Sequence, residues 1–277
     1  MAMTTADAPG GPAVLRVLGI GGSLRAGSYN RALVRAAREE ASSVMEIEIY
    51  DIAPIPFYNA DVEARGDPEP VAAFKAAIRA ADALLIATPE YNHGVPGVLK
   101  NALDWASRPH GRSPLDCKPV AIMGATAGRG STFQAQAQLR AALVYTGSCT
   151  LAQPELSLSQ AGAAFDDGGR LTDPDTATAL RELLEAFAEW VRVIYSGEGE
   201  RYQTQHARLT SDLERIARAS LGRGASRAVA VAAVAKAHGR RCCSPAQGAS
   251  EVRHEHRRSR PHRAGPGDRA ASIRWLP

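Results

Sequence analysis

The chain has 277 residues, of which 45% are hydrophobic, enough to bury the core of one large domain or two small ones. Residues 198–277 hold 16 Lys and Arg against 7 Asp and Glu, whereas residues 1–197 hold 17 against 22, so the net charge of +4 comes from the C-terminal segment. This distribution gives no indication that the main part of the chain binds nucleic acid.

Strands and helices alternate through the first two thirds of the chain. Short apolar runs predict five strands, at residues 15–20, 46–52, 83–88, 119–124 and 150–158. Segments with helical spacing predict helices at residues 30–41, 70–81, 97–107, 131–145 and 175–195. The fifth strand is interrupted by Pro154, and the last helix opens with Asp175, an acidic residue that helix caps favour. This alternation predicts an α/β fold, a doubly wound five-stranded parallel sheet with helices on both faces.

Cysteine usage and the N-terminus favour a cytoplasmic protein. The four cysteines, Cys117, Cys149, Cys242 and Cys243, are too few for a disulfide framework and include no CxxC pair that would indicate zinc. Residues 1–13 lack the basic and apolar regions of a secretory signal, and we expect them to be disordered. No run approaches the roughly 18 apolar residues of a membrane-spanning helix, so we expect no association with a membrane.

Polar, glycine-rich loops follow the first, third and fourth predicted strands, with the sequences GGSLRAGSYN, PEYNHGVPG and GATAGRGS. In doubly wound sheets, ligands bind outside the carboxyl ends of the strands, where the winding reverses. We therefore expect these three loops to form one binding site.

The first of these loops has the chemistry of a phosphate site. It enters a helix N-terminus, where unpaired N–H groups and a partial positive charge favour an anion. Ser23 and Ser28 add hydroxyl groups to this loop. Asn30 adds an amide, and Arg25 adds a charged fork. The loop matches neither GxGxxG nor GxxxxGKS/T, so a monophosphate ester fits it better than a pyrophosphate. The alternative is an ordinary turn capped by serine or asparagine.

Two longer segments, GSLRAGSYNRAL and PEYNHGVPGVLKNALDWASRP, resemble the signature segments of the NADPH-dependent FMN reductase family. This family includes quinone, chromate and azo reductases, and the resemblance covers residues 14–195. It implies a flavodoxin-like fold, FMN as the bound cofactor, and NADPH or NADH as the electron donor. Hydride would pass to flavin N5 and then, in a ping-pong cycle, to a quinone, free flavin, azo compound or metal oxyanion. No catalytic side chain and no metal are implied.

The resemblance also assigns the FMN site residue by residue. The phosphate and ribityl end would lie at Ser23, Arg25, Ser28, Tyr29 and Asn30. The isoalloxazine and ribityl chain would lie along Pro89, Glu90, Tyr91 and Asn92, with Gly94 leaving space for the ring edge. The third loop would close over the other side with Thr126, Gly128 and Gly130. Many family members carry a glycine pair and an arginine where this chain reads STFQ at residues 131–134, which puts the dimer surface or the nicotinamide site in question.

Several residues keep more than one interpretation. Tyr91 is either a flavin contact or a half-buried loop aromatic. His93 is either a bystander or an acid-base group, which flavin chemistry does not need. Glu90 is an exposed carboxylate, a residue that orients the loop through backbone bonds, or, least favoured, a proton-transfer group. Lys100 and Asp104 lie four residues apart, as in a simple surface ion pair on a helix.

The resemblance further implies a homodimer, or a tetramer, with the helix after PEYN at a subunit interface. Leu99, Leu103 and Trp105 on that helix are the interface candidates, with Trp105 alternatively a core residue. The same loops also fit a second class of protein, a non-enzymatic FMN-binding electron carrier or redox sensor of flavodoxin type. The basic, open loop chemistry favours the enzyme.

Residues 198–277 form a basic extension, rich in Ala, Arg and His, that a reductase domain at residues 14–197 does not need. Residues 226–238 predict an alanine-rich helix, and the charged, proline-containing segment after them is expected to be largely disordered. The pairs His254 with His256 and Cys242 with Cys243 indicate metal binding only weakly. The extension is a solvated tail, a basic arm for an acidic partner, or the product of an altered reading frame.

Overall fold

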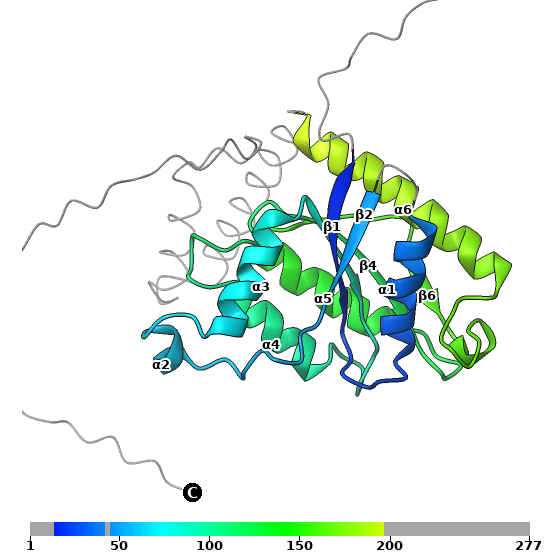
Figure 1. The fold of residues 1–277 in the computed structure, drawn as a ribbon, viewed down its shortest axis with the longest axis horizontal. Coiled ribbons are helices and arrows are strands. Elements are labelled where there is room, and N and C mark those ends of the chain that lie inside the picture. The colour runs from blue at the N-terminus through cyan, green and yellow to red at the C-terminus, as the bar shows by residue number, and fades with distance from the viewer. Residues whose placement is uncertain (1–13, 42–44, 197–277) are drawn as a thin grey trace, which may run out of the picture. The chain divides into compact units, whose positions relative to one another are not determined.

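Parallel strands form a single six-stranded sheet in the computed structural model, which describes residues 14–41 and 45–196 (Figure 1). The strands are β1 (Leu15–Gly21), β2 (Met45–Tyr50), β3 (Ala83–Ala87), β4 (Pro119–Ala125), β5 (Cys149–Thr150) and β6 (Leu156–Leu158). Their order is β2-β1-β3-β4-β5, with β6 also paired to β4. This is the order of flavodoxin-like sheets, whose winding reverses between β1 and β3, so the predicted fold class is confirmed.

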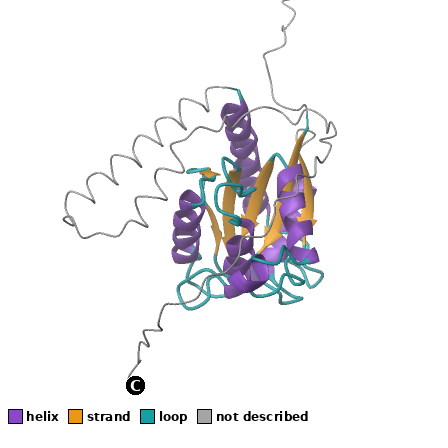
Figure 2. Cartoon of the chain, turned by 90° about the vertical axis from the view of Figure 1, so that its left-hand side faces the viewer, coloured by secondary structure: helices purple, strands orange, loops and turns teal. Residues whose placement is uncertain are grey.

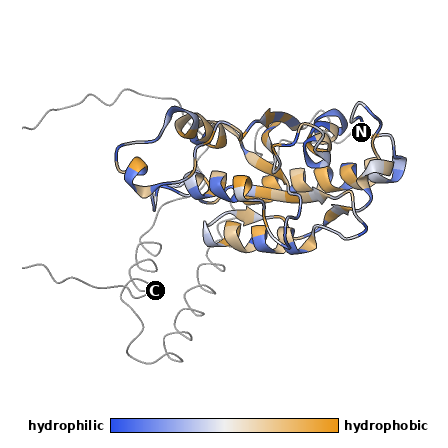
Figure 3. Cartoon of the chain, turned by 90° about the horizontal axis from the view of Figure 1, so that it is seen from below, coloured by the Kyte–Doolittle hydropathy of each residue, from blue (hydrophilic) through white to orange (hydrophobic). Residues whose placement is uncertain are grey.

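Helices cover both faces of the sheet (Figure 2). They are α1 (Tyr29–Glu40), α2 (Ala60–Glu63), α3 (Glu69–Ala80), α4 (Gly97–Ala106), α5 (Phe133–Tyr145) and α6 (Pro174–Tyr195), with a 3-10 turn η1 (Ala161–Ala163). One hydrophobic core joins α1 and α6 to the sheet, and a second joins α3, α4 and α5 to the opposite face. Strands β3 and β4 are buried along their whole length, which explains their continuous apolar sequences. Figure 3 colours the fold by hydropathy, and much of the ribbon at its centre is orange, that is, hydrophobic.

The predicted fifth strand is divided into two short strands. Strand β5 pairs with the beginning of β4 and β6 pairs with its end, so both occupy the same side of β4. Pro154 lies between them and has no N–H to donate to the ladder. The interruption at Pro154 was predicted, and its two halves pair with different parts of β4, so the sheet has six strands in the five positions that were expected.

The cap of α6 and the presence of a short helix after β2 also differ from the prediction. Helix α6 is capped by Asp173 rather than opened by Asp175, because the Asp173 carboxylate accepts hydrogen bonds from the Thr176 N–H at 2.8 Å and from the Thr176 hydroxyl. These bonds lower the pKa of Asp173. The connection after β2 contains the single-turn helix α2, which was not among the predicted helices, and its Asn59 cap accepts from the Asp61 N–H at 2.8 Å.

The three residues proposed for a subunit interface lie in the core instead. Leu99 and Trp105 are completely buried and Leu103 is 4% exposed, all within the cluster beneath α4. The Trp105 indole N–H also donates to the backbone oxygen of Pro56 at 2.8 Å. The interface prediction for these residues was wrong, because the apolar stripe of α4 faces its own sheet. Lys100 and Asp104, on the outer side, form the predicted exposed ion pair at 2.6 Å.

The predictions for residues 1–13 and 198–277, including the helix at residues 226–238 and the histidine and cysteine pairs, lie outside the described residues. Within the described residues, no helix combines the length and the apolar character that crossing a membrane requires.

Candidate functional site

Three loops meet at the carboxyl edge of the sheet, after β1, β3 and β4. The Ser23 hydroxyl lies 3.0 Å from the Tyr91 hydroxyl and joins the first loop to the second. The Asn30 carboxamide joins the start of α1 to the end of β4, donating to the Ala125 oxygen at 2.8 Å and accepting from the Ala125 N–H at 2.9 Å. The predicted gathering of the loops after β1, β3 and β4 is therefore present in the fold.

The first loop presents an anion-accepting surface. Ser23 and Ser28 are each 4% exposed, whereas the loop between them is exposed. Arg25 forms no ion pair among the described residues, and its guanidinium lies 5.7 Å from the centre of the Tyr29 ring. The Ser28 hydroxyl caps α1, and the first turn of this helix contains no acidic residue. Helix N–H groups, hydroxyls and an unpaired guanidinium are the kinds of donor that suit a phosphate group such as that of FMN.

The Asn30 side chain bonds to the backbone of another strand, rather than facing the phosphate site as the sequence suggested. Both polar atoms of its side chain are paired with the backbone of Ala125, and the residue is only 3% exposed. Asn30 therefore fixes the start of α1 against the end of β4. The sequence contained no signal for this contact, which spans 95 residues.

The second loop is a tight turn with an exposed tip. Tyr91 and Gly94 exchange two backbone hydrogen bonds of 3.1 and 3.0 Å. Asn92 and His93 between them take the left-handed conformation, with φ of 51° and 61°. Pro89 is buried beneath the turn, whereas Tyr91 is 50% exposed and its ring is open to a ligand.

Glu90 connects the second loop to the helix that follows the third. Its carboxylate accepts from the N–H groups of Gln134 and Ala135, at 3.0 and 3.1 Å, in the first turn of α5. Its other oxygen lies 3.2 Å from Nδ1 of His93, whose side chain is 77% exposed. A carboxylate is favourable at a helix N-terminus, so the geometry agrees with the interpretation that Glu90 orients the loop.

The third loop is held at its base and exposed at its tip. The Thr126 N–H donates to the oxygen of Leu158 at 2.8 Å, and the oxygen of Gly128 accepts from the Gln160 N–H at 2.8 Å. Gly128 and Gly130 are exposed. The loop is thus anchored to β6 and to the start of η1 while its tip remains accessible.

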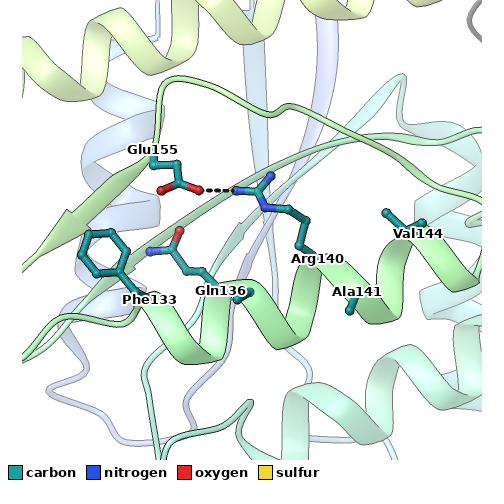
Figure 4. A pocket seen from close by; sticks show the side chains of 7 residues that line it. Phe133, Gln136, Arg140, Ala141, Val144 and Glu155 are labelled. Carbon is teal, nitrogen blue, oxygen red and sulfur yellow. Dashed lines mark hydrogen bonds and ion pairs between the residues drawn. The ribbon is translucent and has the colours of Figure 1, made fainter.

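A hollow of about 730 Å³ lies along α5 (Figure 4). Phe133, Ala141 and Val144 supply apolar surface, and Arg140 pairs with Glu155 at 3.1 Å on one side. None of the predicted FMN residues lines it. In the described part of the chain no cluster of three or more His, Cys, Asp or Glu side chains is arranged to hold a metal ion.

Comparison with known proteins decides the family. The model of the family described as NADPH-dependent FMN reductase matches residues 15–163. The chain belongs to the NADPH-dependent FMN reductase family. The matched region contains all three loops of the carboxyl edge and every residue that was predicted to contact FMN.

Relatives in this family agree with the assignment. An NAD(P)H-dependent FMN reductase of Pseudomonas aeruginosa is 51% identical over 178 residues, which cover 64% of this chain and 96% of the relative. A quinone reductase of Pseudomonas putida is 41% identical over 172 residues, covering 62% of this chain and 92% of the relative. Like these relatives, this FMN reductase family member is an oxidoreductase that uses FMN and NAD(P)H.

A solved structure is similar to this chain in fold. The flavoenzyme NAD(P)H:(acceptor) oxidoreductase FerB from Paracoccus denitrificans is 36% identical, with a TM-score of 0.60. The match covers 64% of this chain and 97% of the FerB chain.

Proposed function

We propose that the chain is an FMN-dependent NAD(P)H oxidoreductase that reduces a small acceptor in a ping-pong cycle. The observation that carries the proposal is the carboxyl edge, where an unpaired Arg25 and an acid-free helix N-terminus lie beside the exposed Tyr91 turn. When bound, FMN supplies the hydride-accepting N5 atom, so no side chain has to act as acid, base or nucleophile.

The side chains bind and orient rather than react. Arg25, Ser23 and Ser28 hold the phosphate with the first N–H groups of α1. Tyr29 supports the Arg25 guanidinium through its ring, and Asn30 fixes the helix start. The charge of Arg25 stays exposed and available to the anion because no carboxylate of the described residues neutralises it.

The flavin ring is assigned to the other two loops. Pro89, Glu90, Tyr91 and Asn92 form its wall on the second loop, and Thr126, Gly128 and Gly130 close the other side. The exposed tips of both loops leave one open face, which NADPH (or NADH) and the acceptor use in turn. Because relatives are named quinone reductases, a quinone is the first acceptor to test, followed by free flavin, azo compounds and metal oxyanions.

Two measurements test the function. Purified protein should show the absorption of oxidised flavin and release FMN on denaturation. Steady-state oxidation of NADPH with a quinone should give parallel lines in double-reciprocal plots, as a ping-pong cycle requires. Intersecting lines would contradict the ping-pong cycle, and bound FMN without any NAD(P)H oxidation would favour the electron carrier or redox sensor.

Three further predictions accompany the proposal. The activity belongs to residues 14–197, so removal of residues 198–277 should leave FMN binding unchanged. The protein assembles as a homodimer or tetramer, through a surface other than Leu99, Leu103 and Trp105. A monomer in size-exclusion chromatography with full FMN occupancy and full activity would contradict this.

The protein is predicted to lie in the cytoplasm, which cell fractionation tests.

A further inference from the structure

Two contacts attach the second loop to α5. Glu90, at the start of the loop, accepts from the backbone N–H groups of Gln134 and Ala135. Val95, at the end of the loop, donates its N–H to the Oε1 atom of Gln138 at 2.7 Å. Residues 134 and 138 are one helical turn apart, so the turn with Tyr91 at its base is fixed at both ends to consecutive turns of one helix.

Gly94 makes room for the second of these contacts. A Cβ atom added at Gly94 would lie 2.9 Å from Oε1 of Gln138 and 3.6 Å from its Cδ and Nε2 atoms. Gly94 does not have a positive φ, so its backbone conformation is open to alanine. The space in front of this glycine is occupied by the Gln138 carboxamide, rather than left free for the edge of a flavin ring.

We propose that Gln138 is a positioning residue of the flavin site, which acts through the hydrogen bond to Val95, and that Gly94 is glycine to admit it. Without this bond the second loop is attached to α5 through Glu90 alone, and the Tyr91 hydroxyl is held less firmly against Ser23. Ordering a looser loop opposes ligand binding. The inference rests on the proposed function, since it concerns the loop that walls the FMN ring.

A double-mutant cycle tests the proposal. Gln138→Ala removes the Oε1 acceptor, and in Gly94→Ala the new methyl group displaces that atom. Both variants therefore lose the hydrogen bond from the Val95 N–H. Each should weaken FMN and riboflavin binding by about 3- to 10-fold, the effect of one neutral hydrogen bond. The double variant should be no weaker than either single variant, because the bond can be lost only once. Fluorescence titration of the apoprotein with each flavin measures all four proteins.

Gln134→Ala is the matched control. It makes the same change one turn earlier on α5, at an exposed side chain, and keeps the backbone N–H that Glu90 accepts. Its flavin affinities should equal those of the wild type.

Two results would overturn the proposal. Unchanged flavin affinity in Gln138→Ala would show that the contact with Val95 does not position the site. If the fold-losses of flavin affinity of the two single variants multiplied in the double variant, Gly94 would contact the flavin directly. If the wild type bound no flavin at all, the proposed function would fail separately. Amide hydrogen exchange at Val95 would then decide the positioning role, because it should be faster in Gln138→Ala than in Gln134→Ala.

Discussion

The basic side chains at the two edges of the sheet differ in whether they have partners within the chain. At the amino edge, the chain pairs its polar groups with one another: the Arg16 N–H donates to Asp82 at 2.8 Å, the Tyr195 hydroxyl donates to the oxygen of Asp82 at 2.8 Å, and Lys118 donates to the oxygen of Ala81. At the carboxyl edge, Arg25 is exposed on its loop and forms no ion pair among the described residues. The pairing at the amino edge therefore stabilises the fold, whereas the unpaired charge of Arg25 fits the ligand that we propose for the carboxyl edge.

The largest predicted effect at the amino edge concerns Lys118 and the pH dependence of the free energy of unfolding. It is 9% exposed, and burial lowers its pKa from 10.5 to about 8. Because the unfolded chain then binds the proton more tightly, the free energy of unfolding should rise between about pH 8 and pH 10.5, by roughly 3 kcal/mol. Lys118→Met should remove this rise while FMN affinity stays unchanged. Urea denaturation of both proteins at about pH 7 and pH 10 measures it, and equal pH profiles would contradict the account.

Glu90→Ala tests whether the carboxyl edge depends on α5. The variant loses the carboxylate that accepts two N–H groups of the first turn, so the free energy of unfolding should fall by about 1–2 kcal/mol. Glu90→Gln keeps one acceptor oxygen and should lose less. Urea denaturation of the apoproteins measures both. Equal losses in the two variants would show that the carboxylate charge, rather than hydrogen bonding, is what matters.

Tyr91→Phe tests the bond between the first and second loops. Loss of the 3.0 Å contact with Ser23 should weaken FMN binding by about 2- to 10-fold. Ser23→Ala removes the other partner, and the double variant should show strong coupling in flavin titrations. Independent effects of the two substitutions would mean that each hydroxyl contacts the ligand on its own.

Arg16→Ala should have the smallest effect. Its ion pair with Asp82 is 3.9 Å long and the Arg16 side chain is 64% exposed, so the free energy of unfolding should change by no more than about 0.5 kcal/mol. The Arg16 N–H that bonds Asp82 belongs to the backbone and survives the substitution. A loss above about 1 kcal/mol in urea denaturation would show that exposed charge stabilises the amino edge.

The central strands and the three loops were predictable because their signals are local. Strands β3 and β4 are apolar throughout, and glycine-rich loops follow them directly. The interruption of the fifth strand was also predictable, because Pro154 has no N–H for the ladder, but the pairing of its two halves with different parts of β4 was not. The cap of α6 was missed by two residues because Asp173 and Asp175 are both plausible caps.

Contacts between distant residues were not predictable from local patterns. Asn30 had the expected chemistry for a phosphate, but its partner Ala125 lies on another strand. Trp105 and Leu99 read as an apolar stripe that fits either a core or an interface, and only the packing of α4 decides for the core. Gln138 carries no motif, and its contact with Val95 spans 43 residues.

The measurement that tests the central claim most directly compares FMN with riboflavin in the wild type and in Arg25→Ala. Arg25 should form charge-assisted bonds to the FMN phosphate, worth about 1.5–3 kcal/mol, so the variant should bind FMN roughly 10- to 150-fold more weakly. Riboflavin lacks the phosphate and should bind both proteins equally, and turnover at saturating FMN should barely change. Wild-type FMN affinity in the variant, or lost turnover with the flavin fully bound, would contradict the assignment of the first loop to the phosphate.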